Sequence, residues 1–156
     1  MSAGTILYVE DEPSDVLLLE TCFSQLAVEL TFRVAKDGQA AIDYLSGKGQ
    51  FADRQQHPLP VLVLLDLNLP RKSGHEVLEW IRRQPALHTL PVIVFSASNR
   101  QLDVHQAYAL GANAYLVKPS GYAELLELMR VLKAFWFEHN QPPPDCKQFQ
   151  EHKRTV

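Results

Sequence analysis

The sequence predicts an α/β protein with an open parallel sheet and helices on both of its faces. Short runs of branched apolar residues alternate with amphipathic stretches, which gives five β/α units within about 140 residues. The run VLVLLD (61–66) is apolar until its final carboxylate, as expected of a central strand that is buried on both faces. The length of 156 residues and the 46% hydrophobic content fit one domain with a full core.

In the first half of the chain, turn residues separate two strands and two helices. Pro13 suits the first turn of a helix, and Asp37-Gly38 marks the turn before another. A polar segment with two prolines follows and is long for such a connection. We expect strands at 5–11 and 30–35, helices at 13–29 and 39–47, and a loop at 47–60.

The second half repeats the alternation three times. Gly111 is placed to close a helix, and the proline-bearing end of the chain looks like a flexible tail. We expect strands at 61–66, 91–97 and 114–118, and helices at 74–83, 101–111 and 121–139. This assigns one domain to residues 1–139 and leaves 140–156 as a tail too short and polar to form another.

Composition excludes several classes of protein. The net charge of −3 and a pI near 6.0 give no sign of nucleic-acid binding, and no DNA-binding domain is expected. The apolar runs are too short to span a bilayer, and the N-terminus lacks the pattern of a signal peptide. Cys22 and Cys146 are far apart and do not resemble a disulfide framework, so we expect a cytoplasmic protein.

Polar side chains follow four of the predicted strands. Glu10 and Asp11 end the first, Asp66 the third, Ser96 the fourth and Lys118 the fifth. Ligands of such sheets bind beyond the carboxyl ends of the strands, so these groups should meet there. Three carboxylates repel one another, and a hard divalent cation such as Mg²⁺ would relieve the repulsion. With the cation bound, Asp66 can attack a phosphoryl group.

The motifs VED, DLNLP, FSA and VKP together resemble the receiver domain of bacterial response regulators, in the same order and spacing over residues 5–139. The resemblance implies a flavodoxin-like sheet of order 2-1-3-4-5 with five flanking helices. It implies that Asp66 is the phosphoacceptor and that Asp11 and Asp66 bind Mg²⁺ directly. Glu10 would act largely through water, and Asn68 would offer its backbone carbonyl to the metal.

The same resemblance assigns the switch residues and a partner. Ser96 and Lys118 match the hydroxyl and the lysine of the family, and Tyr115 matches the aromatic residue that changes rotamer. The segments QFADRQQHP, LLDLNLPRKSG and KAFWFEHNQPPP resemble single-domain receivers that accompany phytochromes. The implied partner is a histidine kinase of the phytochrome type, which would transfer its phosphoryl group to Asp66.

Other functions on this sheet are disfavoured. A hydrolase of the aspartyl-phosphate class needs a second aspartate two residues after the nucleophile, where this chain has Asn68. A flavin module needs a loop of free amides after the first strand, but EDEPSD is acidic. A receiver used only as a phosphorylation-independent scaffold would not need the intact set from Glu10 to Lys118. We therefore expect a signalling protein, not an enzyme that turns over an external substrate.

The last predicted helix suggests a homodimer. One face carries the apolar stripe that covers the sheet, formed by Leu125, Leu128, Met129, Leu132, Phe135 and Trp136. Leu126 and Phe137 form a second apolar strip outside it, which we expect to be exposed and to mark the dimer surface. The resemblance agrees, since phytochrome-associated receivers pair through their fourth and fifth units. The alternative is that the PPP segment folds back over Trp136 and Phe137 of its own chain.

Overall fold

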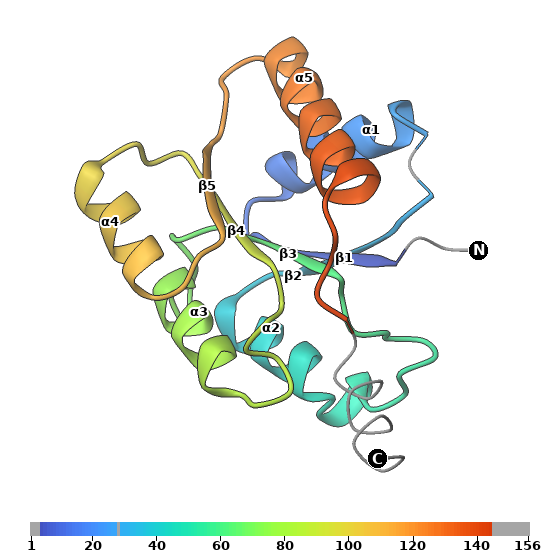
Figure 1. The fold of residues 1–156 in the computed structure, drawn as a ribbon, viewed down its shortest axis with the longest axis vertical. Coiled ribbons are helices and arrows are strands. Elements are labelled where there is room, and N and C mark those ends of the chain that lie inside the picture. The colour runs from blue at the N-terminus through green and yellow to red at the C-terminus, as the bar shows by residue number, and fades with distance from the viewer. Residues whose placement is uncertain (1–3, 28, 145–156) are drawn as a thin grey trace.

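Five parallel strands form one sheet in the order β2-β1-β3-β4-β5 in the computed structural model, which describes residues 4–27 and 29–144 (Figure 1). This confirms the predicted fold class and strand order. The strands are β1 (Thr5–Val9), β2 (Thr31–Ala35), β3 (Leu62–Leu65), β4 (Val92–Ser96) and β5 (Ala114–Val117). The direction of winding reverses between the adjacent strands β1 and β3, so the carboxyl ends of these two strands border the crevice.

Helices cover both faces of the sheet, as the sequence predicts. They are α1 (Pro13–Gln25), α2 (Gly38–Ser46), α3 (Gly74–Arg83), α4 (Gln101–Ala109) and α5 (Tyr122–Lys133). Figure 1 shows α1 and α5 on one side and α2, α3 and α4 on the other. Alternate residues of each strand point to opposite faces. In β1, Leu7 and Val9 therefore pack under α2 and α3, while Ile6 and Tyr8 pack under α1 and α5.

The predicted ends of most elements are off by one or two residues. The largest difference in the first half is α1, which ends at Gln25 and not at residue 29. The chain leaves the helix there because Ala27 takes a left-handed backbone conformation, with φ of 51°. No helix in residues 4–27 and 29–144 is both long enough and apolar enough to cross a membrane.

The loop at 47–60 is anchored to α2 and is not free. Gly47 ends α2 with φ of 71°, and a short 3₁₀ helix spans Gly49–Phe51. The Arg54 guanidinium donates hydrogen bonds of 2.7 and 2.8 Å to the carbonyls of Tyr44 and Leu45, in the last turn of α2. It thereby gives the Leu45 carbonyl at the end of the helix a donor and adds a second donor to the Tyr44 carbonyl, which also accepts from the Gly47 N–H.

The predicted final helix changes its geometry at Lys133. Ala134–His139 is a π-helical segment, in which each turn contains more residues than an α-helical turn. Positions after Ala134 therefore point in directions that the α-helical spacing does not predict. Phe135, expected in the buried stripe, is 52% exposed.

The expected exposed strip of Leu126 and Phe137 is wrong. Both side chains are partly buried and pack against the core between the sheet and the α1–α5 layer. For Phe137 the reason is the wider turn of the π-helical segment, which brings its ring back toward the sheet. The large exposed apolar residues of this region are Val117, Tyr122, Val131 and Phe135.

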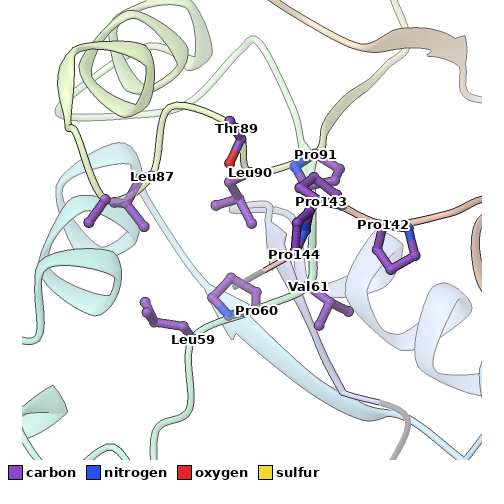
Figure 2. A pocket seen from close by; sticks show the side chains of 11 residues that line it. Leu59, Pro60, Val61, Leu87, Thr89, Leu90, Pro91, Pro142, Pro143 and Pro144 are labelled. Carbon is purple, nitrogen blue, oxygen red and sulfur yellow. The ribbon is translucent and has the colours of Figure 1, made fainter. Parts of the chain in front are cut away.

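The proline segment folds back onto its own chain, which was the alternative to an exposed strip. Pro142, Pro143 and Pro144 line a cavity of about 280 Å³ with residues that precede β3 and β4, among them Val61 and Pro91 (Figure 2). Pro142 also lines a smaller hollow with Trp136 and Phe137. The rest of the expected tail, with Cys146, lies outside the described residues, and Cys22 is a buried free thiol.

Candidate functional site

Three carboxylates meet at the carboxyl ends of β1 and β3. Each of Glu10, Asp11 and Asp66 has an oxygen within 4.8 Å of an oxygen of the other two. The sheet fixes the backbone that carries them, since the Asp66 N–H donates to the Val9 carbonyl at 3.1 Å. Glu10 is only 2% exposed and Asp66 only 6%, whereas Asp11 is exposed. Two acids are thus buried at the edge of the core, with the third open to the solvent.

Lys118 compensates part of this charge. Its Nζ donates to Glu10 Oε2 at 2.7 Å, to Asp15 Oδ2 at 3.0 Å and to Asp66 Oδ2 at 3.1 Å. An ammonium group has three N–H donors, so a carboxylate accepts each of them. Burial disfavours the charged lysine, but the hydrogen bond to Glu10 and the nearby carboxylates outweigh it and raise the pKa of Lys118. The lysine is therefore positively charged in the folded protein.

The single positive charge of Lys118 does not neutralise the three clustered carboxylates of Glu10, Asp11 and Asp66. Burial, together with a hydrogen bond shared with Asp66, raises the pKa of Glu10 from 4.5 to about 7, while the hydrogen bond from Lys118 acts in the opposite direction. Glu10 is thus only partly ionised at neutral pH unless a further cation binds. Oxygen donors at this spacing fit a hard divalent ion. The donor set predicted from the sequence is brought together, and its charge favours a metal.

The metal-free protein should lose stability as the pH rises from about 5 to about 8. The folded state holds the Glu10 proton more tightly than the unfolded chain does, so this contribution is present below about pH 4.5 and is lost as the pH rises through about 7. We expect a loss of about 1–3 kcal/mol in the free energy of unfolding. Urea unfolding in chelator, compared between wild type and Glu10→Gln, isolates the effect, since the variant has no proton to release.

Adding Mg²⁺ near pH 8 should restore the stability that deprotonation removes, because the cation takes over the role of the proton. The recovery should be smaller in Glu10→Gln. A wild-type protein that gains stability over this pH range in chelator, relative to Glu10→Gln, would contradict the raised pKa of Glu10.

The loop after β3 closes around Asp66. Asn68 donates its backbone N–H to Asp66 Oδ1 at 3.3 Å, so the predicted metal ligand lies beside the carboxylate. The helix α3 returns directly beneath the loop, because the Gly74 N–H donates to the Leu67 carbonyl at 3.0 Å. A Cβ atom on Gly74 would lie 2.2 Å from the Asp66 carbonyl oxygen. The backbone approach at Gly74 therefore sets the position of Asp66.

Ser96 and Tyr115 are joined through the loop that follows β4. The Ser96 side chain is fully buried, and its Oγ accepts a hydrogen bond from the Ser98 N–H at 3.2 Å. The Tyr115 hydroxyl donates to the Ser98 carbonyl at 2.8 Å. The Lys118 N–H donates to the Ser96 carbonyl at 2.8 Å, which fixes β5 beside β4. Hydrogen bonds through Ser98 and the Ser96 backbone therefore link the three residues predicted from the sequence, which are Ser96, Tyr115 and Lys118.

The sequence interpretation missed Asp15 and Gly74. Asp15 lies in the first turn of α1 and reaches Lys118 across the rim of the pocket. The available signal was the start of the helix at Pro13, which places its first turn at the carboxyl end of β1. For Gly74 the signal was a glycine directly after a helix-capping Ser73, whose Oγ accepts from the Glu76 N–H. Neither signal reveals a contact by itself, because both depend on the path of a neighbouring loop.

Known proteins share both the sequence and the fold. A family model described as response regulator receiver domain matches residues 6–130. Response regulator Rcp1 of Synechocystis sp. is 35% identical over 133 residues, which cover 85% of this chain and 88% of Rcp1. The crystal structure of the Mn(2+)-bound form of Rcp1 aligns with a TM-score of 0.81 and 34% identity, covering 90% of this chain and 99% of the other.

Two further crystal structures align as well. The response regulator RPA3017 in red light signaling of R. palustris has a TM-score of 0.85 and 38% identity, over 90% of this chain and 98% of the other. The phosphorylated cyanobacterial phytochrome response regulator RcpA has a TM-score of 0.84 and 33% identity, over 90% of this chain and 99% of the other. The chain therefore belongs to the response regulator receiver domain family, which signals by phosphorylation.

Proposed function

We propose that this chain accepts a phosphoryl group from the phosphohistidine of a kinase onto Asp66. A carboxylate oxygen of Asp66 attacks phosphorus, the P–N bond breaks, and its electron pair returns to the imidazole of the kinase. The product is an acyl phosphate, which water later hydrolyses to free phosphate and the original carboxylate. The observation that carries the proposal is the buried Asp66 carboxylate held beside both an acidic metal site and the Lys118 ammonium.

Receiver domains bind a divalent metal at an acidic pocket, and here we propose Mg²⁺. Asp11 and Asp66 would hold it directly, Glu10 largely through water, and Asn68 through its backbone carbonyl. When bound, the metal neutralises charge on the transferring phosphoryl oxygens. Lys118 supplies a second positive charge to the same oxygens, and the small Ala97 leaves room for them. The short distances from Lys118 to Glu10 and Asp66 support this arrangement.

Ser96 and Tyr115 would convert the phosphoryl group into a change of surface. The Ser96 hydroxyl donates to a phosphoryl oxygen, which requires it to move toward Asp66. Its hydrogen bond from the Ser98 N–H would then break, and the Ser98 carbonyl that Tyr115 contacts would shift with the loop. A loop with two discrete arrangements, biased by charge, makes a two-state switch.

The kinase partner is proposed to be of the phytochrome type, which would place the chain in the cytoplasm. Two related proteins support this partner, because RPA3017 is a response regulator in red light signaling and RcpA is a cyanobacterial phytochrome response regulator. The signal would then pass by altered binding to another protein, without turnover of an external substrate. A hydrolase is disfavoured by Asn68, because its side-chain amide is far too weak an acid to serve as a general acid.

Phosphotransfer tests the proposal directly. A phosphorylated histidine kinase of the phytochrome type, incubated with the chain and Mg²⁺, should lose its label to the chain within minutes. Excess chelator should prevent the transfer, because the carboxylates would then repel the incoming phosphoryl group. A label that transfers equally well in chelator, or that maps to a residue other than Asp66, would refute the proposed chemistry.

The homodimer is proposed to form through the β5–α5 face. Val131 and Phe135 are about half exposed and border an apolar hollow of about 420 Å³ between β5 and α5. β5 is also an edge strand, and Val117 at its end is exposed. Exposed apolar side chains beside an apolar hollow are typical of an interface, and two copies would present the same surface to each other.

Val131→Glu should convert the dimer into a monomer, because two buried carboxylates would face each other across the two-fold axis. Light scattering after chromatography at micromolar concentration measures the change. Leu17→Glu is the matched control, since Leu17 is 65% exposed on α1 and does not line the hollow. A wild-type chain that is monomeric at all concentrations, with or without beryllofluoride, would rule out the dimer.

A further inference from the structure

Asp15 is an acid at the rim of the pocket that none of the proposed chemistry uses. It lies in the first turn of α1, and its Oδ2 accepts a hydrogen bond of 3.0 Å from Lys118 Nζ. The side chain of Asp15 is 36% exposed, whereas that of Glu10, on the same ammonium, is 2% exposed. Lys118 therefore connects the interior of the pocket to its rim.

A phosphoryl group on Asp66 needs an N–H from Lys118, and none is spare. The three donors of the ammonium already have three carboxylate acceptors, so a new acceptor must displace one of them or share its donor. The N–H that now reaches Asp66 can turn to an oxygen of the phosphoryl group that Asp66 then carries, but the added negative charge draws the ammonium away from its other two partners. The choice is therefore between releasing Glu10 and releasing Asp15.

Burial decides which acid is released. Freeing Glu10 would leave a carboxylate in the protein interior with no direct cationic partner, since the proposed Mg²⁺ would reach it largely through water, and this is costly. Freeing Asp15 costs less, because its exposed side chain regains water as it leaves the lysine. The contact that should break on phosphorylation is thus the one between Lys118 and Asp15.

We infer that Asp15 is a positioning residue that holds Lys118 in the unphosphorylated protein and competes with the phosphoryl group for it. This inference rests on the proposed function of Asp66. A group that binds one state better than the other shifts the equilibrium toward that state. Asp15 therefore weakens the binding of a phosphoryl group, and its removal should strengthen it.

The test is the affinity of the full chain for beryllofluoride, which stands in for the phosphoryl group, measured by calorimetry with Mg²⁺ present. Asp15→Asn should bind about two- to fivefold more tightly than wild type, the range expected for a partly exposed ion pair. Glu12→Gln is the matched control. It removes one carboxylate charge from the same segment, but Glu12 accepts a hydrogen bond from Ser14 Oγ and does not contact Lys118. Its affinity should change less than about twofold.

Lys118→Ala separates a role through the lysine from a general effect of charge. In that background Asp15→Asn should no longer change the affinity, because the two substitutions act on one interaction. A gain that persists without Lys118, or a gain that Glu12→Gln matches, would overturn the inference. Equal affinities of wild type and Asp15→Asn would overturn it while leaving the proposed function intact. Failure of the wild type to bind beryllofluoride at all would refute the proposed function, and this inference with it.

Discussion

Asp66→Asn should keep the fold, abolish stable phosphorylation and raise the melting temperature of the metal-free protein. Asparagine has nearly the shape of aspartate, and its amide oxygen can still accept the hydrogen bond from Lys118. The amide is not a nucleophile toward phosphorus, so no acyl phosphate can form. Removing one of three clustered carboxylates also relieves repulsion, which burial of Glu10 and Asp66 makes strong. Proteins often become more stable when a functional group is removed from such a site.

The expected gain is about 1–2 kcal/mol, or a few degrees in melting temperature. Thermal unfolding in chelator measures the stability, and labelling by a phosphorylated kinase measures the acceptor. Asp43→Asn is the matched control, since Asp43 lies on α2, where its side chain accepts a hydrogen bond from Gln39. This variant should be labelled by the kinase as wild type is, and its melting temperature should stay close to that of wild type. A base-labile phosphate on Asp66→Asn, or a clear fall in its melting temperature, would contradict the assigned role of Asp66.

The site was predictable where it depends on the ends of strands. Parallel strands bring their carboxyl ends to one edge, so the sequence positions of Glu10, Asp66 and Lys118 were sufficient to place them together. The apolar run before Asp66 made β3 a central strand, and the sheet order confirms this. The spacing of apolar residues, with a period of two in strands and of about 3.6 in helices, predicts where the strands and helices lie.

The parts that could not be predicted depend on contacts between distant segments. Asp15 contacts Lys118 only because the first turn of α1 lies over the pocket, and no pattern in EDEPSD requires this. The π-helical turn at Ala134 is a local departure from regular spacing, and it changes which residues of 134–139 are exposed. The packing of Pro142 beside Trp136 likewise joins segments by tertiary contact, where sequence periodicity gives no signal.

Gly74→Ala should destabilise the protein by about 2–4 kcal/mol and slow phosphorylation of Asp66. The added Cβ would lie 2.2 Å from the Asp66 carbonyl oxygen and 2.7 Å from the Leu67 Cα. Both are backbone atoms, so either α3 or the loop that carries Asp66 must move. Alanine is otherwise favoured over glycine in a helix by about 1 kcal/mol. A loss of stability can therefore come only from the steric clash.

Gly121→Ala is the matched control for this prediction. Gly121 also lies at the start of a helix, but its added Cβ would meet Glu124 Oε2, the far end of a flexible side chain that can turn away. Its cost should stay below about 1 kcal/mol in urea unfolding. Phosphorylation separates a site effect from a fold effect, because displacing Asp66 by about 1 Å should slow transfer by an order of magnitude or more. If Gly74→Ala matched Gly121→Ala in both stability and transfer rate, the backbone approach at Gly74 would not be what positions Asp66.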